Sequence, residues 1–450
     1  MSSLVLVYPF FRPRHDRTVF RFPPLGLGYL AASARRRGFE VDLLDCTFMD
    51  RESALARLRL IKADVIGIYV MVTMQDDALW LARELRGSGA LLAAGGPLPT
   101  VYPSFFLDHF DAVAVGEGDE TICDLLSARV AGRALETVPG LALRRNGGEL
   151  VFSGKRPLSP DLDQLPFPAR DLFPNQSYVD FWEKRFGAAK TTIFTTRGCP
   201  HNCEFCSNAV FGISYRERSE ENVVDEVEEV LSQGYSSVHF ADDVFTLDKE
   251  RVFGICREIR RRKLRLQWEC LGRVDSVDLE LARAMKEAGC QRIYFGIESG
   301  DDSILKLMKK KTSTAQARRA VEDAHKAGIQ TGGFFIVCYP GDCDETVLST
   351  LSFASSLPLD YLSFTVPYPI PGTALYERVK ARVNKNWTMP DSLFSDHVLT
   401  FDADFSEFKM KFAILKGNLQ FKLRQRSGLG LSVLARPFEK VSNALFRILR

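Results

Sequence analysis

Three of the ten cysteines in this 450-residue sequence lie within one span of eight residues. Cys199, Cys203 and Cys206 have the spacing C-x₃-C-x₂-C. Thiolates are soft ligands that suit iron–sulfur clusters, and three of them can hold three irons of a 4Fe–4S cluster while leaving the fourth iron open. Structural zinc needs four ligands. His201 lies inside the run, but no second C-x₂-C pair follows it. The spacing therefore favours an iron–sulfur cluster.

Alternating strands and helices are predicted around and after these cysteines. A strand at 191–195 precedes them, and further strands are expected at 237–240, 267–270, 292–295, 333–338 and 361–366. Helices are expected between them at 220–233, 249–261, 278–288, 314–327 and 345–356. This alternation is typical of a parallel sheet covered by helices. It gives six strand–helix units.

Polar residues follow several of these strands directly. Asp242 and Asp243 come after the second strand, Arg273 after the third, and Glu298 and Ser299 after the fourth. Each has a simpler explanation: Asp242 could cap a turn, Glu298 could form a structural ion pair, and Arg273 could lie on the surface. In barrels built from strand–helix units, the active groups lie at the carboxyl ends of the strands. Their shared position beside the cysteines favours one site.

The first third of the chain predicts a second α/β unit. Strands are expected at 4–8, 41–45, 65–70, 91–94 and 112–115, with helices between them. Such a doubly wound sheet binds ligands beyond the carboxyl ends of its strands. The loops there are 72–74, 95–97 and 116–118, two of them glycine-rich. Glycine lets a backbone approach a large flat ligand closely, although each loop alone is explained by a turn.

The cysteine spacing, with Phe205 before the last cysteine and a strand before the first, resembles the radical SAM signature. The resemblance implies a partial (β/α)₆ barrel. It also implies that S-adenosylmethionine (SAM) binds the open iron and is cleaved to a 5′-deoxyadenosyl radical. The SAM-binding residues that it implies are Phe205, Asp242, Asp243, Arg273, Glu298 and Ser299. Among these, Arg273 and Ser299 would bind the SAM carboxylate, the arginine by a bidentate pair, and the two aspartates would face its amino group.

The glycine loops and the segment 23–30 resemble the cobalamin-binding domain that precedes many radical SAM enzymes. The cobalamin-binding residues that this implies are Leu25, Gly26, Thr73, Gly95, Gly96, Pro97, Gly116, Glu117 and Gly118. The motif Asp-x-His-x-x-Gly is missing, and Leu98 stands where relatives often have histidine. Cobalamin would therefore be held without a histidine ligand from that motif.

Proline-rich sequence separates the two units. Asn146-Gly147 predicts a hairpin turn within 141–152, and five prolines within 153–175 predict an extended connector. The expected domains are 1–152 (cobalamin-binding-like), 153–185 (linker), 186–375 (radical SAM partial barrel) and 376–450 (basic, mostly helical).

The C-terminal region is strongly basic. From Ser406 onward it has ten Lys and Arg residues against Glu407 and Glu439, a net charge of +8. A helical apolar stripe is predicted, with lysines beside it and a second helix starting at Pro437. The stripe is Phe408, Phe412, Leu415, Leu419 and Leu423, and the lysines are Lys409, Lys411, Lys416 and Lys422. A helical cap on the barrel is favoured; peripheral membrane contact or an anionic substrate is the alternative.

Composition excludes several other classes. A net charge of +2 does not indicate nucleic-acid binding, and no apolar run reaches the length of about 20 residues that spans a bilayer. The N-terminus does not resemble a secretory signal, so a cytoplasmic protein is expected. The seven scattered cysteines are expected to be small buried hydrophobic residues.

These features together predict a cobalamin-dependent radical SAM methyltransferase. It would act on an unactivated carbon of a small molecule such as a natural-product intermediate, a tetrapyrrole or a lipid. It would need an external electron donor, flavodoxin-like or ferredoxin-like. The alternatives are a radical dehydratase, deoxygenase, cyclase or epimerase without methyl transfer, and a cluster-containing sensor without turnover.

Overall fold

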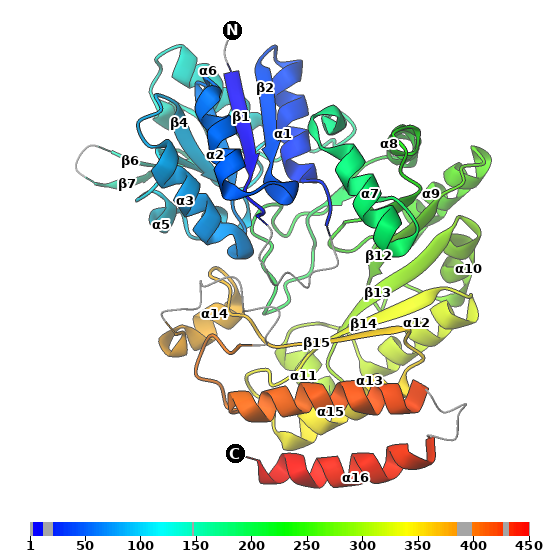
Figure 1. Ribbon diagram of the computed structural model, residues 1–450. Coiled ribbons are helices and arrows are strands. Elements are labelled where there is room, and N and C mark those ends of the chain that lie inside the picture. Colours follow the sequence, from blue (N-terminus) through cyan, green and yellow to red (C-terminus); the bar gives the residue numbers. More distant parts are fainter. Residues whose placement is uncertain (1–2, 12–20, 146–147, 385–397, 426–431, 450) are drawn as a thin grey trace.

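Two sheets of mostly parallel strands organise the protein (Figure 1). The computed structural model describes residues 3–11, 21–145, 148–384, 398–425 and 432–449. The first sheet has the order β2-β1-β3-β4-β5-β6-β7. Its first five strands are parallel, and β6 and β7 form an antiparallel hairpin on β5. The strands are β1 (Ser3–Tyr8), β2 (Glu40–Asp45), β3 (Val65–Tyr69), β4 (Leu91–Gly95), β5 (Ala112–Ala114), β6 (Leu141–Arg144) and β7 (Leu150–Phe152).

Alternating side chains of this sheet fill two hydrophobic cores, because successive strand residues point to opposite faces. Leu4 and Leu6 pack with α1 (Leu25–Arg36) and α6 (Asp119–Val130). Val5 and Val7 pack on the other face, with α2, α3 and the short helices after β4. These helices are α2 (Arg51–Leu60), α3 (Gln75–Leu85), α4 (Pro97–Val101) and α5 (Pro103–Phe106). The predicted doubly wound unit is confirmed.

The second sheet has six parallel strands in the order β15-β14-β13-β12-β11-β8. It confirms the predicted six strand–helix units. The strands are β8 (Lys190–Ile193), β11 (Ser237–Phe240), β12 (Gln267–Gly272), β13 (Cys290–Glu298), β14 (Gln330–Ile336) and β15 (Tyr361–Thr365). The helices between them are α8 (Glu220–Ser232), α9 (Lys249–Arg261), α10 (Leu279–Glu287), α11 (Asp302–Leu307), α12 (Thr314–Lys326) and α13 (Asp344–Ser356).

The proline-rich connector contains one short 3₁₀ turn, η4 (Arg170–Leu172), and then ends in a helix, α7 (Asn175–Phe186). The predicted extended connector 153–175 is thus interrupted by one turn, and a helix occupies the rest of the predicted linker 153–185. Tyr178 of α7 is buried in the core of the second sheet, and its hydroxyl donates to Asp45 of the first domain at 2.6 Å. This helix thus packs against both domains.

In the described ranges, three α-helices follow β15: α14 (Ala374–Val379), α15 (Glu407–Gln425) and α16 (Ser432–Ile448). The mostly helical C-terminal region is thus confirmed, but two details of its prediction are wrong. The second helix begins at Ser432 and contains Pro437. On α15, Phe408, Leu415 and Leu419 are exposed, whereas Lys409 and Lys416 are buried.

Gly417 explains why the predicted apolar stripe of α15 is not the buried face. Gly417 lies so close to the sheet that a Cβ there would come within 2.6 Å of the Phe364 ring. Only the face of α15 that carries small residues can approach β15 and α13 so closely, and this face also contains Met410 and Ala413. None of the described helices is long and apolar enough to cross a membrane.

Candidate active site

The cysteine loop is fixed at its base by a two-stranded ribbon. β9 (Thr196–Arg197) pairs with β10 (Arg216–Glu217). Gly198 then has φ +86°, and a Cβ at this position would lie 1.8 Å from the carbonyl oxygen of Ser214. Both facts require glycine. The loop from Cys199 to Cys206 therefore leaves the ribbon in a direction that no other residue type permits.

The three thiols lie close enough on this loop to act on one another electrostatically. Burial raises the pKa of Cys199, and the charges of Asp243 and Cys203 raise it further. Burial also raises the pKa of Cys206 to about 12, with contributions from Asp243 and the other two cysteines. No three His, Cys, Asp or Glu side chains in the described ranges are already gathered as a metal site.

The donor set of the loop nevertheless fits an iron–sulfur cluster. Three soft thiol ligands share one short loop. His201 lies between the first two cysteines in the sequence. Its Nε2 atom is buried and has no hydrogen-bond partner among the described residues. Cys199, Cys203 and Cys206 are therefore the residues that would hold a 4Fe–4S cluster.

Asp242 has a structural role at the base of the loop. Its carboxylate accepts from the backbone N–H groups of Thr195 (2.6 Å) and Thr196 (3.0 Å) and from the Thr195 hydroxyl. The side chain is buried, and burial raises its pKa. It joins the carboxyl ends of β8 and β11, so its acceptor sites are largely used within the protein. Its neighbour Asp243 is exposed and is the one whose charge acts on the cysteines.

The predicted arginine is buried and already engaged. Nε and Nη2 of Arg273 both donate to Asp275 at 2.9 Å, and Nη2 also donates to the carbonyl of Lys310 at 3.1 Å. The planar fork that would bind a carboxylate in bidentate fashion is thus filled by Asp275.

Two further contacts complete the rim of the second sheet. Lys310 donates to Glu298 at 2.9 Å, and its Nζ lies 6.0 Å from the centre of the Phe205 ring. Glu298 has φ +71°, an uncommon conformation for a residue with a Cβ, and follows an irregular pairing of β13 with β14. Ser299 bonds to Thr350 at 3.0 Å. The six predicted SAM-binding residues therefore share this end of the sheet.

Sequence reasoning missed Lys310, Asp275 and Thr195. Lys310 lies in the run Lys309-Lys310-Lys311, which resembles an ordinary charged surface. Only its burial beside Glu298 distinguishes it. Asp275 and Thr195 act through other site residues, and nothing in their spacing indicated this.

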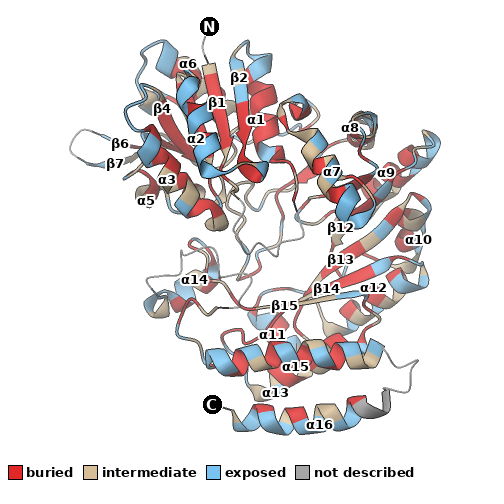
Figure 2. Ribbon diagram, in the orientation of Figure 1, coloured by how far each residue is buried: buried red, intermediate tan, exposed pale blue. Residues whose placement is uncertain are grey.

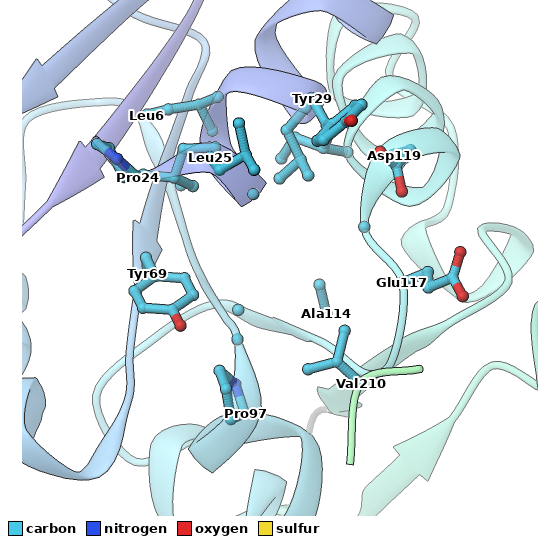
Figure 3. Close-up of a pocket in the computed structure, with 18 of the residues that line it drawn as sticks. Leu6, Pro24, Leu25, Tyr29, Tyr69, Pro97, Ala114, Glu117, Asp119 and Val210 are labelled. Carbon is cyan, nitrogen blue, oxygen red and sulfur yellow. The ribbon is translucent and has the colours of Figure 1, made fainter. Parts of the chain in front are cut away.

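A cavity of about 400 Å³ lies beyond the carboxyl ends of the first sheet's strands (Figure 3). Leu25, Pro24 and Tyr29 lie on one side of it, and Tyr69, Pro97 and Ala114 on another. Eight of the nine predicted cobalamin-binding residues line it: Leu25, Gly26, Gly95, Gly96, Pro97, Gly116, Glu117 and Gly118. Its volume lies in the usual range for cofactor pockets, about 300–1,000 Å³.

The ninth residue, Thr73, does not line this cavity. It lies in a 3₁₀ turn, η2 (Val72–Met74), that carries the chain away from β3 toward α3. Tyr69, at the end of β3, occupies the wall instead. Thr73 as a cobalamin-binding residue therefore stays a prediction, which the cavity lining does not support.

The walls fit a broad and largely apolar ligand. No atom lies within 4 Å of the position that a Cβ would take at Gly26, so the backbone there is open to the cavity. Gly96 and Gly116 have positive φ, +109° and +83°. No histidine, lysine, cysteine or methionine is among the described residues of the lining. A cobalamin held here would thus have no imidazole ligand from the described lining.

Residues of the second domain close this cavity. Phe194, Arg197, Val210 and Phe211 all line it. Val210 is visible at its lower edge in Figure 3. Because Arg197 is only two residues from Cys199, one wall of the cavity is continuous with the cysteine loop.

Buried ion pairs hold the two domains together at this wall. Arg197 donates to Asp119 from Nη1 (2.6 Å) and Nη2 (3.1 Å), and to Glu117 at 3.0 Å. Arg216 also binds Glu117. The guanidinium of Arg197 lies 5.2 Å from the centre of the Tyr29 ring. Nearby acidic residues outweigh burial and raise the pKa of Arg197, so it stays charged.

Comparisons with known proteins agree with both halves of this site. The Radical SAM superfamily model matches residues 193–354, and the B12 binding domain model matches residues 16–126. An uncharacterized methyltransferase of Pyrococcus horikoshii is 34% identical over 380 residues, covering 81% of each chain. This chain therefore belongs to the radical SAM family with a B12-binding domain, the cobalamin-dependent radical SAM methyltransferases.

Two other relatives have named activities. Cytidylyl-2-hydroxyethylphosphonate methyltransferase of Streptomyces wedmorensis is 28% identical, covering 80% of this chain and 78% of its own. Anaerobic magnesium-protoporphyrin IX monomethyl ester cyclase of Cereibacter sphaeroides is 26% identical, covering 84% of this chain and 64% of its own.

Solved structures share the fold. The cobalamin-dependent SAM radical enzyme OxsB matches with a TM-score of 0.78 and 18% identity, covering 99% of this chain and 72% of its own. The methyltransferase TsrM from Kitasatospora setae matches with a TM-score of 0.72 and 21% identity, covering 85% and 75%. The predicted order of a cobalamin-binding-like domain followed by a radical SAM barrel is thus the order of a known fold.

Proposed function

We propose that this chain methylates an unactivated carbon of a small molecule, with the substrate bound between the two domains. The observation that carries this proposal is the shared wall of the cavity. Arg197, Val210 and Phe211 of the second domain face the cavity of the first. A first domain kept only as a scaffold would not need a ligand-sized cavity opening toward the cysteine loop.

The roles of the individual residues follow from their contacts. When bound, a cluster on Cys199, Cys203 and Cys206 would supply the electron that cleaves SAM, and cobalamin would supply the methyl group. Asp243, Arg273 and Ser299 would orient SAM at the strand ends, and Lys310 would hold Glu298 and Phe205 in place. The apolar walls around Leu25 and Pro97 would exclude water. A cytoplasmic flavodoxin-like or ferredoxin-like protein would deliver the electron.

Two variants separate the two halves of the chemistry. Cys199→Ala should lose cluster absorption and 5′-deoxyadenosine formation while keeping bound cobalamin. Gly26→Phe places a ring in the open part of the cavity. It should lose cobalamin while still forming 5′-deoxyadenosine. Both would be measured after anaerobic reconstitution with iron, sulfide and hydroxocobalamin, followed by desalting, absorption spectra and product analysis.

SAM with a trideuteromethyl group then tests methyl transfer itself. Incubation with candidate substrates should give a product carrying the label, together with S-adenosylhomocysteine. Wild-type protein that retains no cobalamin after desalting would contradict the proposal.

A second candidate is radical ring closure without methyl transfer. The similarity to the magnesium-protoporphyrin cyclase of Cereibacter sphaeroides supports it. It predicts 5′-deoxyadenosine without S-adenosylhomocysteine, so the same product analysis distinguishes the two candidates.

A further inference from the structure

The last two helices expose an unusual amount of apolar surface. Of the 17 large apolar side chains that are strongly exposed in the described ranges, six lie on α15 and α16, with exposures between 41% and 76%. Figure 2 shows these helices as the outermost layer below β15, at the end of the molecule away from the first domain. The six residues are Phe408, Leu415, Leu419, Val441, Leu445 and Ile448. Contiguous exposed apolar patches usually mark interaction sites.

The packing of the two helices places these residues on one side. Lys409 of α15 lies 4.9 Å from the centre of the Phe446 ring of α16 and also binds Asp344 of α13. Arg424 of α15 pairs with Glu439 of α16 at 2.8 Å. These contacts define the seam between α15 and α16.

Each exposed stripe points away from the elements that its own helix packs against. On α16, Arg447 follows Phe446 and is directed toward Glu345 of α13 at 3.8 Å, so Leu445 must be turned the opposite way. On α15, Phe408 precedes Lys409 and is turned away from the buried Met410. Residues one position apart in a helix differ by about 100° in direction. Both stripes therefore lie on the solvent side of the α15–α16 pair, and together they are called the α15–α16 face.

Basic side chains border this face. Lys411 and Lys422 are exposed beside the stripe of α15, and Lys440 is exposed next to Val441 on α16. The two acidic residues of these helices, Glu407 and Glu439, already pair with basic neighbours. Within the described ranges Lys422 and Lys440 form no ion pair. The face thus combines apolar contact area with uncompensated positive charge.

We infer that the α15–α16 face docks the enzyme on the surface of an anionic lipid bilayer. Apolar stripes bordered by Lys and Arg are the pattern of helices that lie in the membrane interface. A second copy of the chain would bring the same positive charges together, which disfavours self-association. No described helix can cross the membrane, so the contact is peripheral. This inference does not depend on the proposed reaction.

Vesicle co-sedimentation of the full-length protein tests the inference. The protein should sediment with vesicles of phosphatidylcholine and phosphatidylglycerol, should not sediment with phosphatidylcholine alone, and should be released by high salt. The paired substitution Leu445→Glu and Ile448→Glu should weaken the partition at least tenfold. The side chains at both positions are exposed, so the fold should persist. Leu60→Glu, an 85% exposed position on α2, is the matched control and should bind as wild type.

Charge reversal separates lipid from protein partners. Lys422→Glu with Lys440→Glu should also weaken binding to anionic vesicles about tenfold or more. The inference is overturned if the wild-type protein does not sediment with anionic vesicles. It is equally overturned if the Leu445→Glu/Ile448→Glu variant binds these vesicles with the same affinity as the Leu60→Glu control. It is also overturned if wild type forms a concentration-dependent dimer in gel filtration that these substitutions abolish, because the face would then belong to a second copy.

Discussion

Replacing Arg197 with methionine should weaken the joint between the two domains. Methionine keeps an unbranched side chain that reaches as far as Nε of arginine, but it removes the guanidinium group whose charge Asp119 needs. Both side chains are less than a tenth exposed, so solvent screens little of the interaction. Breaking a buried ion pair by removing one partner costs about 3–5 kcal/mol. The lost contact with the Tyr29 ring adds about 0.5–2 kcal/mol.

Glu117 limits this loss, because it keeps Arg216 as a partner. We therefore expect the free energy of unfolding to fall by about 3–5 kcal/mol in Arg197→Met. Urea unfolding can be followed by intrinsic tryptophan fluorescence, with Trp80 in the first domain and Trp268 in the second. The transitions of the two domains should separate in the variant. Cobalamin retention should fall as well, because Arg197 lines the cavity.

A double-mutant cycle isolates the pair. Adding Asp119→Leu to Arg197→Met removes the orphaned carboxylate, so the double variant should be more stable than Arg197→Met alone. The matched control is Arg37→Met, which breaks a pair with Asp124 inside the first domain. There both side chains are about one third exposed, and the cost should be no more than about 1 kcal/mol. A loss below about 1 kcal/mol in Arg197→Met, or strict additivity in the cycle, would refute the reasoning.

Two further predictions concern the cysteine loop and the C-terminal helices. Gly198→Ala should abolish cluster incorporation, because its Cβ would clash with the carbonyl oxygen of Ser214. Iron content and absorption measure the cluster. The control is Gly212→Ala, which also has a positive φ (+70°) but lies in open space and should keep the cluster. Burial lowers the pKa of Lys416 to about 8. Between pH 8 and about 10.5 the unfolded state therefore binds more protons than the folded state, and the free energy of unfolding should rise with pH over this range. Lys416→Met should remove this rise and stabilise the protein at pH 7 by about 1–3 kcal/mol, seen as a higher Tm. A variant that keeps the wild-type pH profile would contradict this.

The features that could be predicted correctly from the sequence depend on local sequence patterns. The cysteine spacing and the strand–helix alternation are short-range features, and each is sufficient to specify its own element. The glycines at 95, 96, 116 and 118 mark loops at strand ends, and the sheet order then brings these loops to one cavity. The two-domain architecture could therefore be predicted before any contact between domains was known.

Contacts between distant residues could not be predicted in this way. Arg197 and Asp119 are 78 residues apart, and nothing in either segment specifies the other. Asp242 looked like a ligand-binding residue, yet its carboxylate is used by Thr195 and Thr196. The sequence predicted correctly that Asp242 follows a strand. Its hydrogen-bond partners depend on how the ends of β8 and β11 pack together.

The C-terminal helices show the same division. The apolar spacing on α15 indicated an amphipathic helix, but it did not determine which face is buried. The close approach to the sheet at Gly417 decided that, and it left Phe408 and Leu415 outside. Sequence periodicity determines that a helix has an apolar face, whereas the shape of the neighbouring surface determines which face fits against it.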